Sequence, residues 1–253
     1  MSFSTYKPQE RLRPFVKSFS LQESPTERVY TVLPGSSVVL GFQYRGRLSY
    51  LEKEAEQPLS VAGITGLLNN FRIFKNEANT RTALVNFTET GAAYFFKAPM
   101  HELFNGSFSL DDLIPRFEKE IVVEKLSTAT NNEERIKILE AFLISRLSQK
   151  EADLLAVAAV TQIKVSNGLI SISKLADDLN ISQSRLEKRF RAIVGASPKK
   201  FSSIVRLQYI IKELPKTDSL TSLAYDAGYF DQAHFIKDFK AFAGQTPQQF
   251  LNK

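Results

Sequence analysis

Apolar and polar residues in the last third of the chain alternate with the period of about 3.6 residues that is typical of amphipathic helices. Leu186, Phe190, Ile193 and Val194 fall on one stripe of such a helix. A stripe of this width indicates a helix that packs on a core and leaves its other face in solvent. The outward positions of this helix are Ser184, Arg185, Lys188 and Arg191.

A later segment repeats this pattern with phenylalanines on the inward stripe. Phe235 and Phe239 share that stripe, and Phe242 is expected beside them. The sequence therefore predicts two similar surface helices in this part of the chain. The outward positions of the second helix are Gln232, Ala233, Ile236, Lys237 and Lys240.

The two helices belong to an internal repeat. The spacing F-x4-G-x-[ST]-P-x2-F begins at Phe190 and begins again at Phe239. A Leu-Ala pair lies upstream in each copy, followed by Asn180 in the first and by Gly228 in the second. Both residues tolerate the left-handed conformation that ends a helix. Each copy therefore predicts a short helix, a tight turn and a second helix, which is a helix-turn-helix unit.

Capping residues define where these helices begin. In the first copy, Ser171 is expected to cap a helix over about 172–179, and Ser182 to cap the outward-facing one. The corresponding caps in the second copy are Ser219 and Asp231.

A longer helix is predicted between the copies. Ser197 and Pro198 can start it, and it ends before Pro215. At about 1.5 Å per residue, this helix would hold the two units about 25 Å apart. Arg206 lies in an apolar stretch of it, so we favour a buried ion pair with Asp226 or Asp238 over a phosphate contact.

Positive charge is concentrated in the same region. Residues 167–253 carry 13 Lys and Arg against 8 Asp and Glu, within a chain whose net charge is +6. Such an excess suits nucleic acid or an anionic surface, and the repeat favours nucleic acid.

Residues from about 160 to 253 resemble the DNA-binding domain of the AraC/XylS family of bacterial transcription regulators. The stretch SLAYDAGYFDQAHFIKDFKAFAGQTPQQF carries the resemblance. It implies seven helices, double-stranded promoter or operator DNA as the partner, RNA polymerase as a candidate partner, and a cytoplasmic bacterial protein. Carried over by position, base-edge readout falls to Ser184, Glu187 and Lys188 in the first motif, and to Gln232, Ala233, Ile236 and Lys237 in the second.

The chemistry of these side chains suits base readout. Lys188 can donate to guanine, Glu187 can accept from cytosine, Gln232 can pair with adenine, and Ile236 and Ala233 suit a thymine methyl. Family members often carry a bulkier residue where Ser184 stands, which implies a different base preference there. Phosphate contacts are expected from Arg185, Arg189, Arg191, Lys199, Lys200 and Lys240.

The rest of the chain predicts an α+β protein. Short apolar runs separated by Gly, Pro and Asn indicate a β-rich sensor-like domain over 1–110, and helical periodicity indicates a connector over 111–150. The all-α DNA-binding domain then covers 151–253, with two helix-turn-helix motifs joined by a long helix. The apolar stripes of the connector either pack on the sheet, which we favour, or form a dimer surface.

The stretches RLRPFVKSF, VLPGSSVVLGF and ALVNFTETGAAYFFKAPMHELFN resemble an uncharacterised N-terminal domain found ahead of such DNA-binding domains. By analogy with the family, this half binds a small-molecule effector. The alternative is a regulator whose N-terminal half binds only a protein partner. We expect a monomer or a homodimer.

Enzyme motifs are missing from the sequence. It has no G-x-S-x-G, no G-x-G-x-x-G, no cysteine and only two histidines, His101 and His234. Neither histidine has the neighbours that a three-ligand metal site needs. We therefore expect no enzyme, no catalytic residue, no cofactor and no metal. No signal peptide or run of about 18 apolar residues is present, so no membrane association is expected.

Overall fold

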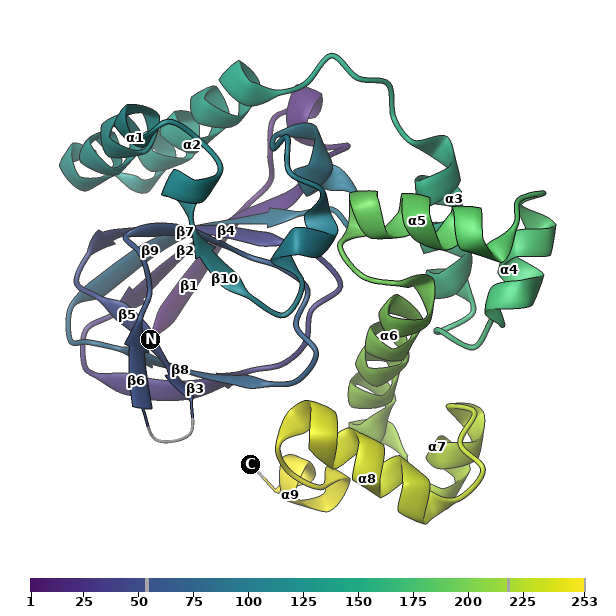
Figure 1. The fold of residues 1–253 in the computed structure, drawn as a ribbon. Helices are drawn as coiled ribbons and strands as arrows, with labels where there is room; N and C mark the ends of the chain where they lie inside the picture. Colours follow the sequence, from purple (N-terminus) through teal and green to yellow (C-terminus); the bar gives the residue numbers. More distant parts are fainter. Residues whose placement is uncertain (53–54, 218, 253) are drawn as a thin grey trace.

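The computed structural model describes residues 1–52, 55–217 and 219–252. Lys253, the last residue of the expected DNA-binding domain, lies outside the described residues. A β-sandwich is covered on one side by two helices and is followed by a helical region with two helix-turn-helix units (Figure 1). The predicted α+β class, with its β-rich first half and all-α last third, is confirmed.

Two antiparallel sheets face each other in the sandwich. The six-stranded sheet has the order β1 (Ser2–Tyr6), β2 (Val16–Ser24), β9 (Thr80–Phe87), β4 (Val39–Arg45), β7 (Ala62–Thr65), β10 (Ser107–Ser109). The four-stranded sheet has the order β3 (Arg28–Val32), β8 (Arg72–Asn76), β5 (Leu48–Glu52), β6 (Ala55–Pro58). Short 3-10 helices connect these elements: η1 (Glu10–Leu12), η2 (Gly91–Tyr94), η3 (Met100–Leu103), η4 (Leu110–Asp112) and, later in the chain, η5 (Leu214–Lys216).

The central strands of the larger sheet have two different faces. Successive side chains of a strand point to opposite sides, so β4 directs Phe42 one way and its neighbours Gly41 and Gln43 the other. Phe42 is fully buried and lies edge to face with Phe142, with ring centroids 5.8 Å apart. Gly41 and Gln43 line the space between the two sheets. The larger sheet therefore has a core face and a cavity face.

Helices α1 (Arg116–Thr128) and α2 (Asn132–Arg146) cover the core face. Asn131 caps α2 by accepting from the Glu134 N–H at 2.9 Å, so a new helix begins here. Buried Leu126 and Leu139 belong to the same core as the sheet. The preferred expectation for the connector, packing within the chain, matches this arrangement.

The helices after the connector are α3 (Leu154–Val165), α4 (Ile172–Asp178), α5 (Gln183–Val194), α6 (Pro198–Glu213), α7 (Leu220–Asp226), α8 (Gln232–Ala243) and α9 (Pro247–Leu251). Each expected cap accepts a backbone hydrogen bond from the third residue after it, as Ser171, Ser182, Ser219 and Asp231 show. Helices α4 and α5 form the first motif, α7 and α8 form the second, and α6 joins them (Figure 1).

The turns of both motifs use the left-handed conformation that the sequence predicts. Asn180 has φ of 50° and Gly228 has φ of 74°. Gly195 and Gly244 end α5 and α8 with φ of 97° and 78°. Because residues other than glycine and asparagine rarely adopt these angles, the turns follow from the sequence itself.

Two separate hydrophobic cores hold the two motifs. Leu186 and Phe190 of the first motif belong to a core that continues into the β-sandwich. Phe235 and Phe239 of the second motif belong to a core of their own. Helix α6 contributes to both cores. Ile204 and Val205 belong to the first core, and Leu207 and Ile210 belong to the second. Arg206 therefore lies where the two cores meet.

Candidate nucleic-acid interface and effector cavity

The outward face of α5 is placed as the sequence predicts. Leu186, Phe190 and Val194 are buried beneath it. The Glu187 and Arg191 side chains lie one helical turn apart, with their charged atoms at 3.8 Å. The exposed side chains of this face are Ser184, Arg185, Glu187, Lys188 and Arg191.

Helix α8 differs from expectation at one position. Gln232, Ala233, Lys237 and Lys240 are exposed, whereas Ile236 is half-buried against the second core. Only part of the Ile236 side chain is therefore open to a base. The Gln232 side-chain oxygen accepts a hydrogen bond from the Thr221 hydroxyl at 3.0 Å, so α7 orients the amide.

Two of the expected phosphate ligands have structural contacts instead. The Arg189 Nε donates to Asp153 at 2.6 Å, and Asp153 also caps α3. The Lys200 ammonium lies 4.9 Å from the centre of the Phe242 ring, and burial lowers its pKa. Arg185, Lys199 and Lys240 stay exposed.

The interpretation of Arg206 as an ion-pair partner is wrong. Its guanidinium lies over the Tyr229 ring at 5.2 Å, and no carboxylate among the described residues comes within 4.0 Å of it. Burial raises the pKa of Tyr229 to about 12, so the ring stays neutral and its face attracts the cation.

The first motif is seated on the N-terminal half of the chain. The added Cβ of an alanine at Gly195 would come within 3.1 Å of the Met100 carbonyl oxygen, so α5 ends in close contact with η3. Glu187 and Arg191 border a hollow that they share with His101 and Phe104. Sequence reasoning missed this contact, because nothing in the local pattern of α5 records a partner from another part of the chain.

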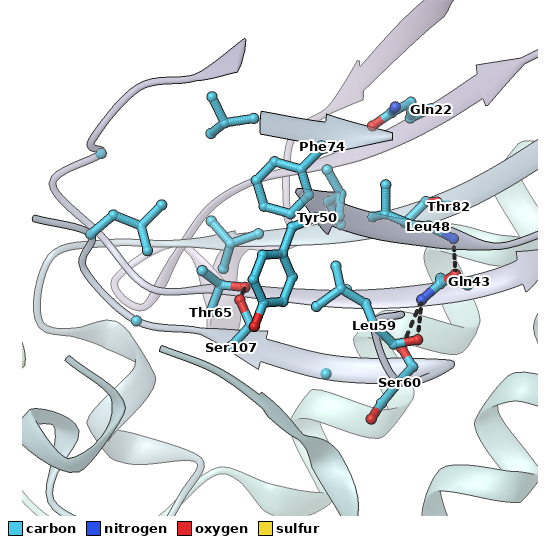
Figure 2. Close-up of a pocket in the computed structure, with 18 of the residues that line it drawn as sticks. Gln22, Gln43, Leu48, Tyr50, Leu59, Ser60, Thr65, Phe74, Thr82 and Ser107 are labelled. Carbon is cyan, nitrogen blue, oxygen red and sulfur yellow. Dashed lines mark hydrogen bonds between the residues drawn. The ribbon is translucent and has the colours of Figure 1, made fainter. Parts of the chain in front are cut away.

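A cavity of about 420 Å³ lies between the two sheets. Its wall on the smaller sheet is a row of aromatic side chains, because Phe74 of β8 is paired in register with Tyr30 of β3 and with Tyr50 of β5. The Tyr30 and Phe74 rings stack with centroids 6.0 Å apart. Figure 2 shows the Phe74 and Tyr50 rings directed into this space.

The opposite wall carries a polar row. Thr82 of β9 is in register with Gln22 of β2 and with Gln43 of β4. The Gln43 amide nitrogen donates to the carbonyl oxygens of Leu59 and Ser60, and its oxygen accepts from the Leu48 N–H (Figure 2). Gln43 therefore fixes the loop after β6, while the buried Thr82 hydroxyl has no hydrogen-bond partner among the described residues.

The cavity wall also reaches the second motif. Leu33, just after β3, lines the cavity and packs on the core of the second motif. Close by, the Phe71 N–H donates to the Phe242 carbonyl oxygen at 2.8 Å. The N-terminal half thus contacts each motif through a different segment.

Other kinds of site find no support in the described part of the chain. No helix there is long and apolar enough to cross a membrane. The same residues contain no group of three or more His, Asp or Glu that could hold a metal ion.

Comparison with known proteins divides the chain in the same way. The model of a helix-turn-helix domain matches residues 175–253, and that of a domain of unknown function (DUF6597) matches residues 4–109. An uncharacterised HTH-type transcriptional regulator of Staphylococcus aureus is 32% identical over 82 residues, which are 32% of this chain and 11% of that protein. The HTH-type transcriptional regulator MtrA of Neisseria gonorrhoeae is 36% identical over 81 residues, which are 32% of this chain and 27% of MtrA.

The chain thus spans only a small part of the length of these relatives. Among solved structures, ToxT from Vibrio cholerae overlays 100% of this chain and 98% of its own at 11% identity, with a TM-score of 0.49. The likeness to known regulators lies in the sequence matches and in the two motifs themselves. Residues 175–253 thus belong to a helix-turn-helix domain that is similar to those of HTH-type transcriptional regulators.

Proposed function

We propose that this protein is a transcription regulator that binds double-stranded DNA in a sequence-specific manner through α5 and α8, and that it catalyses no reaction. The observation that carries the proposal is the repeated unit: two motifs with caps and turns at corresponding positions, joined by one helix. The residues that would read bases are Ser184, Glu187, Lys188, Gln232, Ala233 and Lys237, with a smaller part for half-buried Ile236.

The length of α6 supports a two-site mode. Its 16 residues span about 24 Å at about 1.5 Å per residue. Successive major-groove segments on one face of B-DNA are about 34 Å apart, so moderate bending of the DNA would let both recognition helices enter. Arg185, Lys199 and Lys240 would then supply phosphate contacts.

We further propose that the β-sandwich takes a small effector. A cavity of about 420 Å³ falls within the range of roughly 300–1,000 Å³ that small-molecule sites occupy. This volume favours a small molecule over the alternative of a protein partner alone. Leu33 gives the effector a direct route to the second motif, because the same side chain faces the cavity and that motif's core.

The test is a footprint on the promoter regions nearest the gene, repeated at rising salt. We expect protection of two adjacent major-groove segments and a steep loss of affinity with salt, because Lys and Arg contacts to phosphates release counterions. Lys188→Ala should weaken protection of one segment, while Lys174→Ala, on the neighbouring helix α4, serves as the control. No retention of any promoter duplex at low salt, or a flat salt response, would contradict the proposal.

A further inference from the structure

We infer that the cavity of the β-sandwich takes an uncharged molecule with a flat apolar body and a single hydrogen-bonding group that meets Thr82. The inference rests on the proposed effector role of the N-terminal half and adds the chemical class of the ligand.

The absence of charge in the wall sets the first limit on the ligand. Among the described residues that line the cavity, every polar side chain is an amide or a hydroxyl. An ionised carboxylate or ammonium entering this space would lose its hydration without gaining a counter-ion, which is strongly unfavourable. A neutral molecule avoids that cost.

A cation beside the cavity is already engaged by the protein. The Arg72 guanidinium lies 5.1 Å from the centre of the Tyr50 ring and donates to the Ser107 hydroxyl at 3.1 Å. A second nitrogen of the same group donates to the Asn105 carbonyl oxygen. Arg72 is therefore held by the protein and does not line the cavity as a partner for an anion.

The aromatic row sets the shape of the ligand. Tyr30, Phe74 and Tyr50 come from three adjacent strands in one register, so they form a continuous apolar wall. A flat ring system has the geometry to stack on, or to meet edge-on, such a wall. Most of the exposed lining is apolar, in keeping with a ligand that is itself mostly apolar.

Thr82 sets the position of the polar group. The side chain is 2% exposed, and its hydroxyl has no hydrogen-bond partner among the described residues. A buried hydroxyl without a partner is unfavourable for folding, whereas a ligand hydrogen bond would satisfy it. Gln22, beside it in the polar row, makes only long contacts of 3.4 Å to the Tyr30 hydroxyl and to the Met1 sulfur.

Gly41 leaves the room for the ring. A Cβ added there would meet the end of the Leu84 side chain at 3.2 Å and the Gly63 carbonyl oxygen at 4.0 Å, with no closer atom. A larger side chain at this position would therefore extend into the cavity. Gly41→Val fills the cavity with a residue that is well suited to a strand.

The experiment titrates the full-length protein with two matched probes, 2-naphthamide and 2-naphthoate. They share one ring system and differ in charge. The chain has no tryptophan, so naphthyl fluorescence can be followed against a background of tyrosine alone. We expect one saturable site for the amide and binding at least about tenfold weaker for the carboxylate.

Three variants locate the site. Gly41→Val should abolish binding of 2-naphthamide. Thr82→Val should weaken it roughly fivefold and leave the Tm equal or higher, because the variant loses a hydroxyl that has no partner in the protein. Thr31→Val, the same change on an exposed position of β3, is the matched control and should leave binding unchanged.

Binding of 2-naphthoate as tight as that of the amide, no saturable binding of either probe, or unchanged binding in Thr82→Val would each overturn the inference. The Thr82→Val result stands even if Gly41→Val fails to fold. The titration contains no DNA. A negative result would therefore exclude this class of ligand without testing DNA binding, which the footprint measures. A negative footprint, conversely, leaves the titration valid.

Discussion

The Phe71 N–H donates to the Phe242 carbonyl oxygen at 2.8 Å, and the Phe71 ring lies directly against Gly244. This contact joins the segment before β8 to the end of the recognition helix of the second motif. Together with Leu33, it ties the second motif to the β-sandwich.

Phe71→Ala should loosen the second motif. Phe71 is half-buried, so its loss should cost about 2 kcal/mol at this contact, less than a fully buried phenylalanine would. We expect amide hydrogen exchange over residues 239–244 to become at least about tenfold faster, while exchange in α5 is unchanged. Phe117→Ala, at an exposed position of α1, is the control. Equal exchange in both variants would show that Phe71 does not restrain α8.

Lys237→Ala and Lys240→Ala should have different effects, although both remove one exposed lysine from α8. In the proposed mode Lys237 contacts bases, so its loss should cost about 1–3 kcal/mol of discrimination at one half-site. In the same mode Lys240 contacts phosphate, so its loss should weaken binding to all sequences alike and lower the salt slope by about one. Competition with single-base variants of the site separates the two, and identical profiles would exclude base readout by Lys237.

A one-residue insertion after Arg206 should separate folding from two-site binding. It would rotate the second motif by about 100° and shift it by about 1.5 Å relative to the first. The two cores meet at this point of α6, with Val205 in the first and Leu207 in the second, so each keeps its own residues. We expect loss of the two-site footprint with near-normal circular dichroism.

Ser203→Gly is the control for that insertion. This substitution lowers the helix propensity of α6 by under about 1 kcal/mol and does not change the rotation of one motif relative to the other. It should leave the footprint intact. If the insertion variant protected both half-sites at the wild-type concentration, the motifs would dock independently of α6.

Acid should weaken the contact between the β-sandwich and α3. Burial, the largest single effect, acts to raise the pKa of Glu89. The hydrogen bond from Lys164 at 2.6 Å, a backbone hydrogen bond and the charges of Lys164 and Lys17 together outweigh it and hold the pKa below its ordinary value of 4.5. A carboxyl with a lowered pKa stabilises the fold above its ordinary pKa, and this stability is lost as the pH falls through the folded value.

Glu89→Gln should therefore destabilise the protein by about 1 kcal/mol near neutral pH, a modest figure because the Lys164 side chain is 49% exposed. The difference from wild type should shrink as the pH falls below the ordinary pKa of a glutamate, because Glu89 is then protonated in both the folded and the unfolded chain. Denaturant unfolding across this pH range is the measurement, with Glu124→Gln on the exposed face of α1 as the control. A difference that persists in acid would assign the effect to packing.

The helix-turn-helix units could be predicted because their signals are local. Asn180 and Gly228 lie at the turns that they create. Each cap accepts a hydrogen bond from the backbone N–H three residues later in the chain. Arg206 could not be placed in this way, since Tyr229 and two acids were all reachable from the sequence and only packing selects the ring. The half-burial of Ile236 against the second core depends on packing in the same manner.

The cavity could not be predicted for a different reason. Gln22, Gln43 and Thr82 lie on three strands, and only their pairing registers bring them into one row. The short apolar runs that include VLGFQYR and TRTALVNF did indicate strands. They did not indicate that one face of these strands lines a cavity between two sheets.

The division of the hydrophobic core between the two motifs has a consequence for the operators that such a protein can use. The first motif shares its core with the β-sandwich, so in the proposed DNA-binding mode the half-site read by α5 would set the orientation of the β-sandwich on the promoter. The second motif has its own core and meets the sandwich through contacts such as Leu33 and the Phe71–Phe242 hydrogen bond. We therefore expect operators to vary more readily in the distance and phase of the α8 half-site, whereas inverting the α5 half-site would turn the effector domain to face the other way along the DNA.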